Sequence, residues 1–164
     1  IPLRLVGSEM CIRDRWGALW LGIASDAVNR AGRFVRAAAR KTPGQTPPTA
    51  LRLAEVANKL QSMRANVHAV AQECAALQDA PEGNEAMLGM GFALRMNNLK
   101  IYCSEIMVTI VHEALLICGI MGYKNDTPYS LGRHLRDAHS AALMIGNDRI
   151  YAKNASLLLV HKEV

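Results

Sequence analysis

Aromatic residues are scarce in this sequence, at 5% of 164 residues, and no stretch alternates between apolar and polar residues as a half-buried strand does. Strands are enriched in aromatic and β-branched residues, whereas alanine, leucine and methionine, which are frequent here, favour helices. Apolar residues make up 51% of the chain, enough to build a core and to exclude a largely disordered protein. The composition therefore predicts an all-helical domain.

The chain also lacks any strong concentration of charge. Its net charge is +5, and the basic residues are scattered without forming a long run. A nucleic-acid-binding domain usually gathers its lysines and arginines on one face or along one helix. We therefore expect no nucleic-acid partner.

Cysteine pairing signals are missing as well. Four cysteines occur, at wide spacing and without a C-x-x-C pair: Cys11, Cys74, Cys103 and Cys118. Three of them fall within apolar helical patterns, where a free cysteine behaves as a small buried hydrophobe. We expect reduced thiols and a cytoplasmic protein.

Membrane and metal signals fail on inspection. The most apolar window, Ile106 to Met121, is too short to span a bilayer and contains His112 and Glu113. These two residues begin a zinc-protease H-E-x-x-H motif, but Leu116 stands where the second histidine is required. The sequence predicts neither a membrane span nor a metal site.

Helical periodicity is the strongest positive signal. Apolar residues recur at three- and four-residue steps in the segments 16–40, 49–79, 85–118 and 138–159, with a short helix over 130–137. Four long helices joined by short loops predict an up-down four-helix bundle. In the last helix the pattern places four residues inward: Met144, Tyr151, Ala155 and Leu158.

A glycine-containing loop followed by a charged cluster stands out between the third and fourth helices. Gly119, Gly122 and Tyr123 precede an irregular connection, after which Arg133, His134, Arg136 and Asp137 crowd together. Binding residues are often placed on loops that rigid helices hold in position, so this stretch is where we expect a ligand to bind. We expect Asp137 to pair with Arg133 or Arg136 and to fix the loop against the bundle.

This stretch resembles the acyl-CoA dehydrogenase superfamily, in which a Gly-Gly-x-Gly-[Tyr/Phe] loop precedes Arg-Asp-Ala and then Tyr-Glu-Gly-Thr. Arg40-Lys41-Thr42-Pro43-Gly44 resembles the family's Arg-x-x-Phe-Gly turn, and Leu53-Ala54-Glu55 resembles the start of its next helix. The resemblance covers roughly residues 16–164. It implies the family's C-terminal four-helix bundle, which supplies part of an FAD site across a subunit interface.

Three residues are implied as cofactor contacts by this resemblance. Arg40 matches the arginine that contacts the FAD pyrophosphate, and arginine suits that role because its planar fork binds phosphate oxygens in pairs. Gly119 matches the first loop glycine, although Ile120 and Leu116 replace a glycine and a glutamine of the pattern. Asn147 replaces the threonine of Tyr-Glu-Gly-Thr and retains the ability to hydrogen-bond flavin.

The catalytic base of the family is missing from its usual place. Counting from Arg136-Asp137-Ala138, the glutamate position falls on Ile145, which cannot accept a proton. Some family members carry the base on the first bundle helix, which corresponds to a position near Arg15. The catalytic residue is therefore unassigned.

The first fifteen residues are interpreted separately. Val6 to Arg15, VGSEMCIRDR, resembles a translated sequencing adapter. We therefore expect residues 1–15 to lie outside the fold and residues 16–164 to form the C-terminal domain of a longer flavoenzyme.

The resemblance implies an FAD-dependent oxidoreductase of fatty acid metabolism that desaturates acyl-CoA thioesters between the α and β carbons. The fragment alone is expected to be inactive and to assemble as a homo-oligomer or with a sister subunit. Two alternatives stay open: a flavin-dependent monooxygenase on the same fold, and a catalytically silent subunit.

Overall fold

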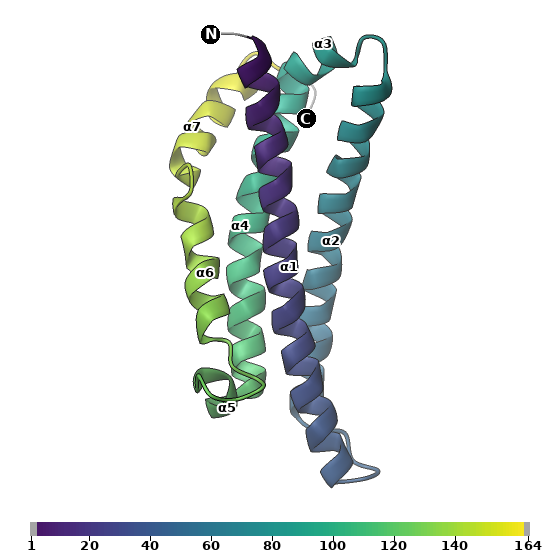
Figure 1. Ribbon diagram of the computed structural model, residues 1–164, viewed down its shortest axis with the longest axis vertical. Coiled ribbons are helices and arrows are strands. Elements are labelled where there is room, and N and C mark those ends of the chain that lie inside the picture. The colour runs from purple at the N-terminus through teal and green to yellow at the C-terminus, as the bar shows by residue number, and fades with distance from the viewer. Residues whose placement is uncertain (1–2, 163–164) are drawn as a thin grey trace.

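Seven helices make up the fold in the computed structural model, which describes the backbone of residues 3–162 and the side chains of residues 16–162. In chain order they are α1 (Leu3–Lys41), α2 (Thr49–Asp79), α3 (Gly83–Leu88), α4 (Met90–Cys118), α5 (Ile120–Tyr123), α6 (Gly132–Leu143) and α7 (Asn147–Leu158). Helices α1, α2 and α4 run up and down the long axis, and α6 and α7 together form the fourth column (Figure 1). The predicted all-α bundle is confirmed.

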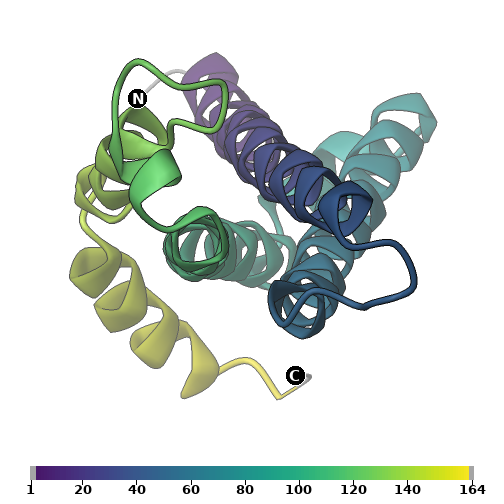
Figure 2. The same cartoon turned by 90° about the horizontal axis from the view of Figure 1, so that it is seen from below.

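Helix α4 lies at the centre of the bundle. Seen from one end, it is surrounded by α1, α2 and the column formed by α6 and α7 (Figure 2). Within the described residues it is the one helix long and apolar enough to cross a membrane by length and composition, and half of its most apolar window is buried inside the bundle. Packing in the core accounts for this apolar character.

The apolar core joins α1, α2 and α4. The predicted stripe of α1 supplies Ala24, Ala27 and Ala31, each fully buried, while α2 supplies Val56 and Met63. Small residues on α1 let its backbone approach α4 closely. This part of the fold follows the three-four periodicity of the sequence.

The third predicted helix is divided at Gly89, which the prediction missed. Gly89 has φ −66° and ψ 150°, so α3 ends there and α4 begins in a new direction. Just before it, Gly83 packs so tightly that a Cβ atom would lie 1.6 Å from the carbonyl oxygen of Leu77. The close turn around the end of α2 therefore requires glycine at this position.

The fourth predicted helix is also divided, at residues 144–146, and its predicted inward residues are wrong. Met144, Tyr151 and Leu158 are 40%, 50% and 45% exposed, and Ala155 is exposed too. Ile150 and Asn154 are the buried residues of α7. The break turns α7 so that Ile150 and Asn154, and not the predicted stripe, face inward.

Helix α1 begins at Leu3, before the predicted start at Trp16. The side chains of residues 1–15 lie outside the described part of the structure. The prediction that these residues do not belong to the domain therefore remains a prediction.

Candidate functional site

Two glycines, Gly119 and Gly122, shape the loop that follows α4. Gly119 ends α4 with φ 56°, a conformation that favours glycine, and its amide donates to the carbonyl oxygen of Leu115 at 2.8 Å. Gly122 is buried, and a Cβ atom there would lie 2.7 Å from that of Cys118. Its carbonyl oxygen accepts the amide of Leu131 at 2.7 Å, which closes the loop immediately before α6.

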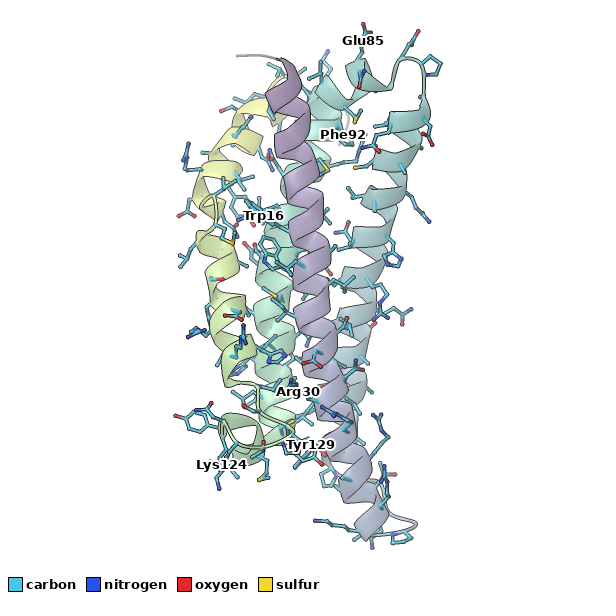
Figure 3. The ribbon with its side chains drawn as sticks, in the orientation of Figure 1. Trp16, Arg30, Glu85, Phe92, Lys124 and Tyr129 are labelled. Carbon is cyan, nitrogen blue, oxygen red and sulfur yellow. The ribbon has the colours of Figure 1, made fainter. Side chains whose placement is uncertain are left out.

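A row of charged side chains on α1 holds the segment from Pro128 to His134. Asp26, Arg30 and Arg33 are spaced by four and three residues, so they share one face of the helix. The Arg30 guanidinium donates to the Ser130 carbonyl oxygen at 2.8 Å, and that of Arg33 donates to the Pro128 carbonyl oxygen at 3.2 Å. Figure 3 shows Arg30 near Tyr129, the residue between these two carbonyl groups.

Asp26 is the hub of this attachment. Its Oδ2 atom lies 2.8 Å from Arg30 Nε and 2.7 Å from His134 Nε2. Burial alone would raise the pKa of Asp26, but the hydrogen bonds and positive charge of Arg30 and His134 outweigh it, and the pKa is lowered. The ionised carboxylate accepts from Nε2, while His134 Nδ1 is buried without a hydrogen-bond partner among the described residues.

Two open clefts flank the start of α6. The larger has a volume of about 510 Å³, and the smaller, between α1 and α6, about 280 Å³. The larger cleft is lined by Leu115, Tyr123, Asn125, Gly132, Arg133, Leu135 and Arg136. An apolar floor with two guanidinium groups suits a ligand that carries both an apolar part and an anionic part.

The arginines of the larger cleft are only loosely paired. Arg133 Nε and Arg136 Nε lie 3.6 Å and 3.7 Å from the carboxylate oxygens of Asp137, and both side chains are more than 80% exposed. The predicted pairing of Asp137 is therefore present with both arginines. Exposed pairs of this length contribute little to stability, so both guanidinium groups can turn toward a ligand.

Arg40 is separate from the glycine loop. It lies in the last turn of α1, is exposed, and makes no hydrogen bond or ion pair with another described residue. The end of α1 extends beyond α5 and the loop (Figure 1). Arg40 and Gly119 thus lie at the ends of different helices, and no hydrogen bond or ion pair among the described residues joins them.

Asn147, the third predicted cofactor contact, lies at the start of α7 in a network of polar side chains. Its Oδ1 atom accepts from Lys100 Nζ at 2.6 Å, and its Nδ2 atom donates to Ser104 Oγ and Glu105 Oε1, each at 3.1 Å. Two turns further along α7, Asn154 accepts from Asn97 at 2.7 Å and donates to Asn98 at 2.9 Å. These contacts between α4 and α7 form what we call the polar seam: Asn97, Asn98, Lys100, Ser104 and Glu105 with Asn147 and Asn154.

Lys100 is a residue of this site that sequence reasoning missed. It is fully buried, and its ammonium group also lies 5.9 Å from the centre of the Trp20 ring. A buried lysine is costly unless it is hydrogen-bonded. Its position between two apolar residues, Leu99 and Ile101, was the signal available in the sequence.

Ile145, at the position of the family's base, is 46% exposed and has φ 52°. Its side chain offers no proton acceptor. The nearby carboxylates in the chain are Glu105, which is hydrogen-bonded to Asn147, and Asp148, which is exposed in the first turn of α7. The alternative base position near Arg15 lies outside the residues whose side chains are described.

Two cysteines of α4, Cys103 and Cys118, are unsuited to nucleophilic chemistry. Cys103 and Cys118 are buried free thiols. Burial raises the pKa of Cys103 to about 12 and that of Cys118 to about 11, so both remain protonated near neutral pH. The described residues contain no group of three potential metal ligands.

The fold and the loop define an up-down helical bundle domain with a glycine loop between its third and fourth columns. The family described as "Acyl-CoA dehydrogenase, C-terminal domain" matches residues 13–155. The chain therefore belongs to the acyl-CoA dehydrogenase family through this domain. No curated protein matched the chain, and no solved structure matched it either.

Proposed function

We propose that this chain is the C-terminal bundle of an FAD-dependent acyl-CoA dehydrogenase-like oxidoreductase, and that it contributes to FAD binding and to subunit association. The observation that carries the proposal is the family match over residues 13–155. Acyl-CoA is the proposed substrate and the cytoplasm the proposed compartment. The remaining parts of such an enzyme would lie outside residues 16–164.

The residues proposed to contact FAD fit an anionic cofactor. Arg40 presents an exposed guanidinium, suited to a pyrophosphate. At Gly119 a Cβ atom would meet nothing within 4 Å, so the backbone there is open to a ligand. Arg133 and Arg136 add positive charge beside the same loop.

Separation of Arg40 from the loop supports a site shared between subunits. A second copy that placed its glycine loop opposite Arg40 would assemble a more complete site. We therefore propose a homo-oligomer, or a pair with a sister subunit, as the functional form.

In the proposed desaturation of an acyl-CoA, FAD would accept the hydride, and residues of this chain would bind and orient the FAD. Asn147 Nδ2 already donates to Ser104 and Glu105, so Asn147 would contact a flavin acceptor by exchanging its hydrogen bond with Glu105 for one to the flavin. Proton abstraction from the α carbon needs a positioned acceptor, and Ile145 provides none. The base would have to come from another position or another chain.

A second candidate is a catalytically silent subunit that completes a partner's FAD site. The exposed Ile145 favours it, because an apolar side chain occupies the base position. Anaerobic addition of an acyl-CoA to the assembled flavoprotein distinguishes the two. Flavin bleaching by a homo-oligomer of this protein would eliminate the silent-subunit candidate.

Cofactor binding is tested by titrating FAD fluorescence with this chain and with two arginine variants. Arg40→Ala should weaken binding about tenfold, which corresponds to about 1.4 kcal/mol, the scale of one charge-assisted contact. Arg36→Ala is the matched control, since Arg36 is an exposed arginine one turn earlier on α1 and should leave the affinity unchanged. Unquenched flavin fluorescence up to saturating chain concentration, or equal effects of the two variants, would contradict the proposal.

A further inference from the structure

The elbow between α6 and α7, residues 144–146, contains an unusual backbone conformation. Ile145 has φ 52° and is the one non-glycine residue with positive φ in the described part of the chain. For a β-branched side chain this is a genuine outlier, because its Cβ atom lies too close to the backbone. Such a conformation persists only where the surrounding structure imposes it.

Burial of side chains at the elbow does not impose this conformation. Met144 and Ile145 within the elbow are 40% and 46% exposed, and Leu143 just before it is 80% exposed. Before the elbow, Ala141 is fully buried and fixes the end of α6 against the core. A backbone hydrogen bond from Gly146 to Leu143, at 3.3 Å, spans the elbow, and the first turn of α7 constrains it on the other side.

Asn147 provides that constraint through the interior of the bundle. Its amide oxygen accepts from the fully buried Lys100 at 2.6 Å, and Ser104, also fully buried, accepts from its amide nitrogen at 3.1 Å. Lys100 is rigidly placed, because it lies on the central helix α4 and packs beside Trp20. Moving the start of α7 would leave the Lys100 ammonium without this hydrogen bond in a buried environment, which is costly.

We propose that Lys100 is a positioning residue that acts through Asn147 to hold Ile145 in its left-handed conformation. It thereby fixes what the elbow presents at the surface, which is an apolar side chain at the base position. The functional meaning of this placement rests on the proposed function, whereas the mechanical link between Lys100 and Ile145 does not.

The test is a double-mutant cycle that uses Ile145→Gly as a sensor of strain. Glycine adopts positive φ without steric cost, so the substitution relieves strain only while the elbow is held in its native conformation. The melting-temperature change caused by Ile145→Gly should be more favourable in the native background than in an Asn147→Ala background, by about 2–4 °C. Effects on the unfolded chain are the same in both backgrounds and cancel.

Two further backgrounds make the result specific. Asn147→Asp keeps an acceptor for Lys100, so the full effect of Ile145→Gly should return. Asn154→Ala is the matched control, since it removes a buried amide of α7 from the same seam at a distance from the elbow. The effect of Ile145→Gly should remain intact there.

Lys100→Met tests the lysine directly and should abolish the sensor effect as Asn147→Ala does. If Lys100→Met fails to fold, the two Asn147 backgrounds decide the question.

The Ile145 backbone resonance provides a second readout: it should shift in Asn147→Ala and stay near its native position in Asn147→Asp. An equal effect of Ile145→Gly in the native and Asn147→Ala backgrounds, or its loss in Asn154→Ala, would overturn the proposal. No step requires flavin, so this outcome is independent of the FAD titration.

Discussion

The bundle is held together in two different ways on the two sides of α4. Toward α1 and α2, α4 presents fully buried apolar residues such as Met96, Met107 and Ile110. Toward α7, α4 makes the hydrogen bonds of the polar seam, and α7 buries a single apolar side chain, Ile150, together with Asn154. Apolar burial is strong and non-directional, whereas buried hydrogen bonds fix one geometry and fail when one partner is lost.

The largest expected effect is therefore in the apolar core. Met63→Ala should destabilise the protein by about 2–5 kcal/mol, because Met63 is fully buried and its loss leaves a cavity. Met90→Ala is the matched control: Met90 is 44% exposed and should change stability by less than about 0.5 kcal/mol. Urea unfolding of both variants measures the difference, and similar midpoints would contradict the assignment of the core.

A smaller effect is expected in the polar seam. Asn154→Ala should cost about 1–3 kcal/mol, since it leaves the buried Asn97 amide without its hydrogen bond to Asn154. Asn29→Ala, at an exposed position of α1, should cost nothing, because alanine is the better helix former. A neutral result for Asn154→Ala in urea unfolding would mean that the seam does not hold α7.

The smallest effect belongs to Asp26, whose attachment is half exposed. Its pKa in the folded state is lowered from an ordinary value of 3.8, so folding favours the ionised form. Its contribution to stability is fully present above that ordinary value and is lost as the pH falls through the lower, folded pKa. The wild type should therefore exceed Asp26→Asn in melting temperature near neutral pH, and the gap should narrow below about pH 4.

The control for this prediction is Asp126→Asn, because Asp126 is exposed in the loop and makes no ion pair with another described residue. Its melting temperature should follow that of the wild type across the same pH range. A gap for Asp26→Asn that widens as the pH falls would show that the sign is wrong.

The same contrast explains what the sequence could predict. The apolar stripes of α1, α2 and α4 alternate at helical spacing, so the core and the bundle could be recognised from periodicity. The stripe assigned to residues 138–159 was misleading, because Met144 and Tyr151 are exposed and the inward face of α7 is formed by Ile150 and polar side chains such as Asn154. Periodicity reports burial of apolar groups and contains no signal for a helix anchored by asparagines.

The candidate site divides in a similar way. Gly119 could be recognised because a positive φ at a helix end calls for glycine, and the pairing of Asp137 with neighbouring arginines is local in sequence. The contact of Asp26 with His134 and that of Lys100 with Asn147 join residues far apart in the chain. Only the packing of α1 and α4 against the fourth column brings them together.

Hydrogen exchange of the native protein tests most directly whether the two sides of α4 are held in different ways. Because α7 is held by the polar seam and one buried apolar side chain, Ile150, its amides should exchange through local opening at a lower free energy than those of α1 and α4. The exchange of α1 and α4 should approach the global unfolding free energy. Asn154→Ala should accelerate exchange in α7 while leaving α2 nearly as protected as before, once the change in global stability is subtracted. Equal protection of α7 and α4, or a uniform acceleration in the variant, would contradict this account.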